Sequence, residues 1–178
     1  LLDLAGSIKD AWDYDGFLID PINSLRKDLR NTNGYEYSYE CLTDIRIFCK
    51  KYNIATWICC HAVTNALRNK HTGNHDFSGQ PMPPSIGDAE GGAVNANRAD
   101  DFLIIHRYIY SPDSWMYTRL FVAKVKMQEL GYKPTSYESP IMFKSILNNV
   151  GFEIGGHNLI KYKTKKQLTI DNTRKDSK

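Results

Sequence analysis

The sequence contains no long apolar run. None of its hydrophobic stretches approaches the roughly 20 residues that a membrane-spanning helix needs. The first residues, Leu1, Leu2, Asp3 and Leu4, also lack the basic segment that opens a signal peptide. We therefore expect a protein that has no contact with a membrane and resides in the cytoplasm.

Cysteine is scarce, and its spacing does not suit a metal site. The four cysteines form no C-x-x-C pair. A zinc site would have to draw on the residues that fall close together in the sequence, namely Cys59, Cys60, His61, His71 and His75. Neighbouring residues of a strand point to opposite faces, so these side chains do not converge easily. We expect buried, reduced thiols instead of a zinc site or a disulfide framework.

The sequence also lacks a strong charge imbalance and a phosphate-binding loop. The formal net charge of +3 is too small to indicate nucleic-acid binding by itself. No G-x-x-x-x-G-K-[ST] segment occurs anywhere in the 178 residues. Any nucleotide chemistry must therefore be argued from other residues.

Four short apolar runs are present, and they predict an α/β fold. They cover residues 16–20, 55–60, 101–107 and 119–126. Because they are apolar throughout, they favour strands that are covered on both faces, as in a mostly parallel sheet flanked by helices. Between the first two runs, Ser38 is the expected N-cap of a helix that ends at Asn53. Strand, helix and strand together predict a right-handed crossover.

The other segments are less regular. Residues 62–90 are rich in Asn, Gly, Pro and His and predict a long loop, which in a compact domain is usually functional or disordered. Gly91 and Gly92 precede a short helical stretch that runs to Ala99. Residues 140–146 and 151–154 predict edge strands or a hairpin, and residues 161–178 predict a polar, basic tail behind a domain of residues 1–160.

Polar side chains follow the predicted strands, where ligands bind in open α/β sheets. They are Asp20, His61, Arg107, Lys124 and Lys126. A carboxylate, an imidazole and several cations at one sheet edge suit a metal-bound polyphosphate. Structural alternatives remain open for each: a turn or cap for the aspartate, a hydrogen-bonded loop position for the histidine, a carboxylate pair for the arginine and a solvated edge for the lysines.

Four segments in this order resemble the ring-shaped DnaB-type replicative helicases, in their Twinkle and phage primase-helicase branch. "FLIDPINSL" resembles the Walker B segment, and "WICCHAVTNALRNK" resembles the third motif, a strand that ends in His before a DNA-binding loop. "GGAVNANRADDFLIIHRY" is similar to a glycine-rich segment that leads into a strand ending in Arg. "LFVAKVKMQELG" is similar to the last core strand, and together the four cover residues 16–131.

The resemblance implies a role for each matching residue. Asp20 would organise Mg²⁺, directly or through water, and His61 would sense the terminal phosphate of ATP or another nucleoside triphosphate. Arg107 would lie near the nucleotide base, and Lys124 and Lys126 would reach into the ATP site of a neighbouring subunit. The resemblance also implies contacts with the phosphates of single-stranded DNA. The residues that would make them are Arg68, Lys70, Gly91 and Gly92.

The resemblance also implies a RecA-like P-loop ATPase core, here without its N-terminal side, because the family's P-loop and catalytic glutamate precede the Walker B strand. Residues 1–160 would then be the C-terminal part of the motor domain, and truncation is the expected reason for the missing loop. The implied partners are single-stranded DNA, further copies of the chain in a ring, which in this family is a hexamer, and a primase domain or primase partner. The implied compartment is the cytoplasm of a bacterial or phage-infected cell.

Two other functions fit the same residues. One is a recombinase-like ATPase, and the other is a non-catalytic DNA-binding or assembly module, which the missing P-loop favours. A further departure from the family is Lys126, which stands where the family usually has Arg. A lysine offers a point charge without the planar fork of a guanidinium, so stabilisation of a transition state in trans would be weaker.

Overall fold

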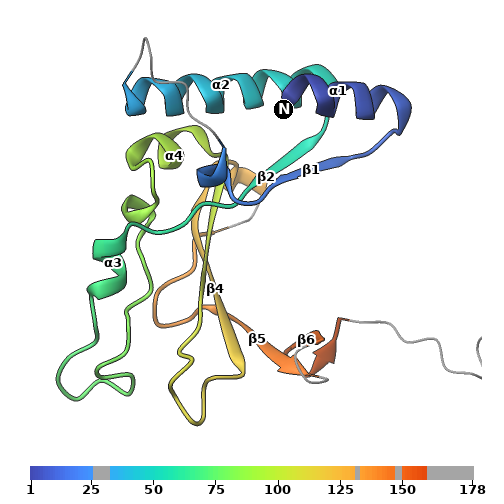
Figure 1. The fold of residues 1–178 in the computed structure, drawn as a ribbon. Coiled ribbons are helices and arrows are strands. Elements are labelled where there is room, and N and C mark those ends of the chain that lie inside the picture. The colour runs from blue at the N-terminus through green and yellow to red at the C-terminus, as the bar shows by residue number, and fades with distance from the viewer. Residues whose placement is uncertain (26–32, 131–132, 147–149, 160–178) are drawn as a thin grey trace, which may run out of the picture.

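The computed structural model describes residues 1–25, 33–130, 133–146 and 150–159 (Figure 1). Its helices are α1 Leu2–Ala11, α2 Gly34–Tyr52, α3 Thr64–Arg68 and α4 Ala93–Arg98, with short 3-10 turns at Ile22–Ser24, Ile86–Asp88 and Gln128–Leu130. Its strands are β1 Gly16–Ile19, β2 Ala55–Ile58, β3 Asp101–His106, β4 Tyr117–Val125, β5 Ile141–Ile146, β6 Gly151–Ile154 and β7 His157–Asn158. The predicted tail, residues 161–178, lies outside the described residues.

The strands form two separate sheets, so the predicted mostly parallel, RecA-like sheet is wrong. β1 and β2 make a parallel pair, whereas β3 to β7 make an antiparallel sheet in chain order. The short connection between β3 and β4, residues 107–116, consists of turns. A parallel pair needs a crossover of about a dozen residues or more, usually with a helix, so this connection returns the chain antiparallel. Continuous apolar runs alone did not distinguish the two arrangements.

The first half of the chain does form the predicted crossover. Gly16 pairs with Ala55 and Ile19 with Ile58 in parallel register, and α2 connects the two strands. The helix begins earlier than expected. Its N-cap is Asn33, whose side chain accepts hydrogen bonds from the amides of Tyr35 and Glu36, while the predicted cap, Ser38, lies within the helix. The predicted end is confirmed, since Asn53 adopts the left-handed conformation with φ of 49°.

The core lies around α2, which packs beside α1 and α4 and over β1 and β2 (Figure 1). Leu42 and Ile45 of α2 are buried with Ile19 of β1 and Val94 of α4. Val94 is only 1% exposed. A separate cluster joins α1 to the other end of α2 through Ala5, Phe48 and Ile54. The buried stripe of α2 therefore holds the parallel pair and α4 in fixed positions.

The predicted strands near the C-terminus are confirmed as an antiparallel pair. Ser145 of β5 pairs with Phe152 of β6, and β5 pairs with β4 on its other side. The cysteines in the structure are free, but they are not buried as expected: Cys59 is exposed and the other three are half-buried. Within the described part of the chain, no helix combines the length and the apolar character needed to cross a membrane.

Candidate functional site

Asp20 and His61 lie at the same edge of the parallel pair, as predicted. Each follows the C-terminal end of its strand, and two backbone hydrogen bonds extend the pairing past the strand ends: the amide of Cys59 donates to Ile19 (2.8 Å) and the amide of Ile22 donates to Cys59 (2.9 Å). Both side chains are exposed to solvent. A carboxylate and an imidazole are thus available together at one sheet edge.

Two residues that sequence reasoning did not select complete this edge. The side-chain oxygen of Asn23 accepts a hydrogen bond from the amide of His61 (3.2 Å), which ties the turn after β1 to the end of β2. The thiol of Cys59 lies beside Asp20. Burial raises the pKa of Cys59, and the charge of Asp20 and a hydrogen bond to its carboxylate raise it further. We refer to Asp20, Asn23, Cys59 and His61 as the strand-end site.

Residues 62–90 form a long segment that starts beside this edge of the parallel pair and returns to it. We call this segment the excursion. At its base, the amide of Glu90 donates to His61 (2.8 Å) and that of Val63 donates to Asp88 (2.7 Å). Farther out, Lys70 bridges to Pro81, and the amide of Met82 donates to Asn69 (2.8 Å). The predicted loop is therefore an ordered, two-limbed structure with its base beside His61, which the irregular composition did not indicate.

The predicted DNA contacts of the excursion occupy its outer part. Arg68 ends the short helix α3, and Lys70 lies at the bridge between the two limbs. Both side chains are exposed, and neither has a hydrogen bond or an ion pair with another described residue. The two cations are therefore free to meet phosphate groups in solution.

Gly91 and Gly92 form a tight turn between the excursion and α4. Both have positive φ, 98° and 65°, a conformation that L side chains rarely adopt. A Cβ on Gly91 would lie 2.8 Å from the side-chain nitrogen of Asn95, which itself donates to Glu90 (2.7 Å). The amide of Gly92 donates to Ala89 (2.8 Å), so it is occupied within the turn. These glycines have a clear conformational role in the return from the excursion.

Arg107 follows β3 and binds the chain's own backbone. Its Nε and Nη2 donate to the carbonyl oxygen of Trp115 at 3.2 and 2.6 Å, closing the turn between β3 and β4. The side chain remains exposed. The structure thus places this predicted base-proximal residue on a turn of the antiparallel sheet.

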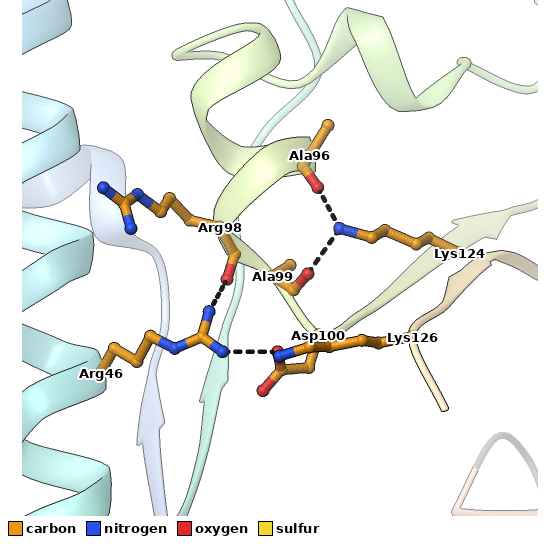
Figure 2. Close-up of polar contacts among 7 residues, drawn as sticks. All are labelled: Arg46, Ala96, Arg98, Ala99, Asp100, Lys124 and Lys126. Atoms are coloured by element: carbon orange, nitrogen blue, oxygen red, sulfur yellow. Dashed lines mark hydrogen bonds and ion pairs between the residues drawn. The ribbon is translucent and has the colours of Figure 1, made fainter. Parts of the chain in front are cut away.

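Lys124 and Lys126 point from the end of β4 toward α4 and the start of β3 (Figure 2). Lys124 donates to the carbonyl oxygens of Ala96 and Ala99 at 2.7 and 2.8 Å, where it caps the C-terminal end of α4. Lys126 pairs with Asp100 at 2.6 Å. The predicted common orientation of the two lysines is confirmed, and both are engaged within the chain.

Two arginines complete this basic cluster, which we define as Arg46, Arg98, Lys124 and Lys126. Arg46 of α2 donates to the carbonyl oxygen of Arg98 (3.3 Å) and to Asp100 (3.1 Å). The guanidinium of Arg98 lies 3.7 Å from the centroid of the Tyr39 ring. The hydrogen bond from Lys126 holds the pKa of Asp100 below its usual range, with Arg46 adding to this effect. The carboxylate of Asp100 therefore pairs with two of the four cations of the basic cluster, Arg46 and Lys126.

The expected gathering of all these residues at one sheet edge is wrong. β3 and β4 run antiparallel, with Asp101 opposite Val125 and His106 opposite Arg119. Arg107 therefore lies at one end of this strand pair, and Lys124 and Lys126 lie at the other. Of the predicted residues at strand ends, Asp20 and His61 share an edge, because their strands, β1 and β2, run parallel.

Among the described residues, no group of three or more His, Cys, Asp or Glu side chains could hold a metal ion. Asp20 therefore provides a single carboxylate, which suits Mg²⁺ only where phosphates and water supply the other oxygens. The chain matches no protein-family model and no curated protein.

Proposed function

We propose that this chain is part of the motor of an ATP-dependent replicative DNA helicase of the DnaB type, which moves on single-stranded DNA and unwinds duplex DNA. The proposal rests mainly on the β1–α2–β2 unit and on the excursion, and Lys124 and Lys126 at the end of β4 add a contact between subunits. Its main support is that Asp20, His61 and the base of the excursion all lie at one edge of the parallel pair. The residues proposed to bind phosphate and the segment proposed to bind DNA would then be directly connected.

In this proposal the strand-end site faces the phosphates of ATP or another nucleoside triphosphate. Asp20 would hold Mg²⁺, directly or through water, and His61 would donate a hydrogen bond to a phosphate oxygen. The bound metal would supply charge neutralisation at the phosphates. Because the amide of His61 is bonded to Asn23 and its carbonyl to Glu90, a shift of His61 would act on both the Walker B turn and the excursion.

The excursion would hold single-stranded DNA through Arg68 and Lys70. Both side chains are exposed, and neither is paired within the described residues. The two residues lie close together in the sequence, in the limb of the excursion that leads to residues 71–80. Contacts of this kind are electrostatic and have little sequence preference, which suits a protein that moves along a strand. Gly91 and Gly92 would contribute by shaping the return of the chain, and the amide of Gly91 would assist at the phosphates, whereas that of Gly92 is bonded to Ala89.

Lys124 and Lys126 would act toward a neighbouring subunit of a ring, a hexamer in this proposal, with a primase domain or partner alongside. Lys126 would have to leave Asp100 to reach a nucleotide in trans, and Lys124 would have to leave the end of α4. Lys126 is the better candidate because its side chain is 51% exposed and its partner is a surface carboxylate. Surface ion pairs of this type contribute little and exchange readily.

A non-catalytic DNA-binding module is the second candidate, because the 178 residues contain no phosphate-binding loop. The two candidates share the excursion and differ in nucleotide chemistry. In both cases the chain by itself should bind Mg-ATP weakly, since the backbone amides and lysine of such a loop make most phosphate contacts. The DNA-binding step can therefore be tested on this chain alone.

Photo-crosslinking of an oligothymidylate that carries 4-thiothymidine tests the placement of DNA. Peptides from residues 62–90 should carry most of the crosslinks, and unlabelled single strands should compete better than duplex. The Arg68→Ala/Lys70→Ala variant should lose these crosslinks. A matched control, Lys50→Ala/Lys133→Ala, removes two exposed lysines elsewhere and should retain them. Crosslinks confined to other segments in the wild-type chain would refute the proposed DNA-binding role of the excursion.

A further inference from the structure

The tip of the excursion, residues 71–80, lies against the β3–β4 pair through a stack of rings. Phe77 stacks on Tyr108 with centroids 3.7 Å apart and an interplanar angle of 6°. His71 stacks on His75 at 3.8 Å, and its Nε2 is 2.8 Å from the hydroxyl of Tyr108. His106 meets Tyr108 edge-on at 4.6 Å. Rings of the tip therefore contact the ring of Tyr108 in the turn that follows β3.

The cation in this cluster is Arg119, which is 9% exposed. Its guanidinium carbon lies 4.8 Å from the Phe77 centroid and 4.6 Å from the Tyr108 centroid, so both rings cover it. Its Nη1 has no hydrogen-bond partner within the described residues, and it has no ion pair there. The two rings therefore replace the carboxylate that a buried guanidinium usually has.

His106 lies next to this cation, opposite Arg119 in the β3–β4 register. Its Nε2 is buried and lacks a hydrogen-bond partner among the described residues, as does the side-chain oxygen of Gln80. A proton added to His106 would thus place a second positive charge beside Arg119, at a nitrogen without an acceptor.

The charged groups around the cluster do not compensate for such a proton. The tip contributes His71, His75 and the exposed carboxylate of Asp76. β5 contributes Lys144, on the same sheet face as Arg119, and it pairs with Glu153 at 3.5 Å. Besides these, the packed elements bring His106, Tyr108 and Arg119. Of the carboxylates, one is solvated and the other already has a partner.

We propose that this cluster is a proton-sensitive latch: it fastens the tip, residues 71–80, to the β3–β4 pair when His71 and His106 are neutral, and it releases the tip when they gain protons. This device is separate from the proposed helicase activity, because it depends only on contacts within the chain. Release of the tip would change the position of Lys70, which directly precedes it, and this would be the regulatory consequence of the latch.

The direction of the effect follows from the two histidines. Burial, followed by the charge of Arg119, lowers the pKa of His106 to about 4, against a small opposing effect of a hydrogen bond with the backbone of Pro81. Burial, followed by His75, lowers the pKa of His71 as well. In the released state the pKa values of both histidines return toward 6.5. The latch is therefore at full strength above pH 6.5 and weakens as the pH falls from there toward 4.

Hydrogen exchange of the tip amides tests the latch. The amides of His71 and Gly79 donate within the tip, to Gln80 and His71, and that of Met82 donates to Asn69 beside it. We expect these bonds to open when the rings of the tip leave the sheet, so their protection follows the latch. From pH 7.5 to 5.0, after correction for intrinsic rates, their protection should fall about 30-fold from His106 alone, since the pKa difference sets the ratio. The amides of Cys59 and Glu90, bonded at the base of the excursion, should keep theirs.

The His106→Phe variant removes the titrating group while retaining an apolar ring, and its tip protection should depend much less on pH. Ring resonances of wild-type His106 provide a second readout that needs no variant: the titration midpoint of His106 should lie well below 6.5, at about 4. The proposal is wrong if wild-type tip protection is independent of pH, if His106 titrates near 6.5, or if a folded His106→Phe variant shows the same loss of protection.

Discussion

The ammonium nitrogen of Lys126 lies 2.6 Å from Oδ1 of Asp100, the residue that precedes β3. Arg46 of α2 binds the same oxygen at 3.1 Å, so one carboxylate joins the end of β4 to the central helix (Figure 2). This arrangement orients the lysine that the helicase proposal places at a subunit interface. It also means that the carboxylate can be altered without touching the cation.

Asp100→Asn should lower the free energy of unfolding by less than about 1 kcal/mol at pH 7, because the carboxylate is 58% exposed and solvent screens its pairs. Since the pKa of Asp100 is lowered in the folded chain, its contribution is present above the ordinary value of 3.8 and is lost as the pH falls through the lower folded value. Urea denaturation of both proteins at pH 7 and pH 3 measures this. A difference between the two proteins that is as large at pH 3 as at pH 7 would contradict the ion-pair assignment.

The contact between Asp20 and Cys59 predicts a change in thiol reactivity. Asp20→Asn removes the negative charge beside the thiol, so the pKa of Cys59 should fall and its alkylation by iodoacetamide at pH 7.5 should become several-fold faster. Peptide mass spectrometry separates Cys59 from Cys60. Asp15→Asn, at the opposite end of β1, is the matched control and should leave the rate unchanged. Equal rates in both variants would show that Asp20 does not face Cys59 in solution.

The start of α2 at Asn33 is testable by a pair of cap substitutions. Asn33→Ala removes the acceptor for two helix amides and should destabilise the protein by about 1 kcal/mol, or about 2–4 °C in Tm. Ser38→Ala should change Tm little, because Ser38 lies inside the helix, where its hydroxyl donates to the carbonyl of Gly34. Thermal unfolding by circular dichroism distinguishes the two, and a larger loss for Ser38→Ala would support the cap predicted from sequence.

The sequence predicted local structure well where a single pattern determined it. The crossover from β1 through α2 to β2, the left-handed end at Asn53 and the paired strands of residues 140–154 were all expected. The strand-end placement of Asp20 and His61 followed from that crossover. Cap choice was harder, because Asn33 and Ser38 are both good N-cap residues and only the box with Glu36 distinguishes them.

Strand direction in the second half could not be read from apolar runs. A run such as residues 101–107 looks the same in a parallel and an antiparallel sheet, and the turn-forming connection after Arg107 decided between them. The order of the excursion was also hidden, since its limbs are held by backbone hydrogen bonds and its tip by rings from distant strands. Neither kind of contact leaves a periodic signal in the sequence.

The salt dependence of single-stranded DNA binding tests the central claim most directly. Fluorescence anisotropy with a labelled oligothymidylate should show log Kobs falling linearly with log salt for the wild-type chain. Arg68→Ala/Lys70→Ala should bind more weakly and reduce the slope by about 1.4, because each single-strand phosphate contact contributes about 0.7. Lys50→Ala/Lys133→Ala should keep the wild-type slope. Identical slopes for the wild type and Arg68→Ala/Lys70→Ala would contradict the claim that the excursion holds DNA.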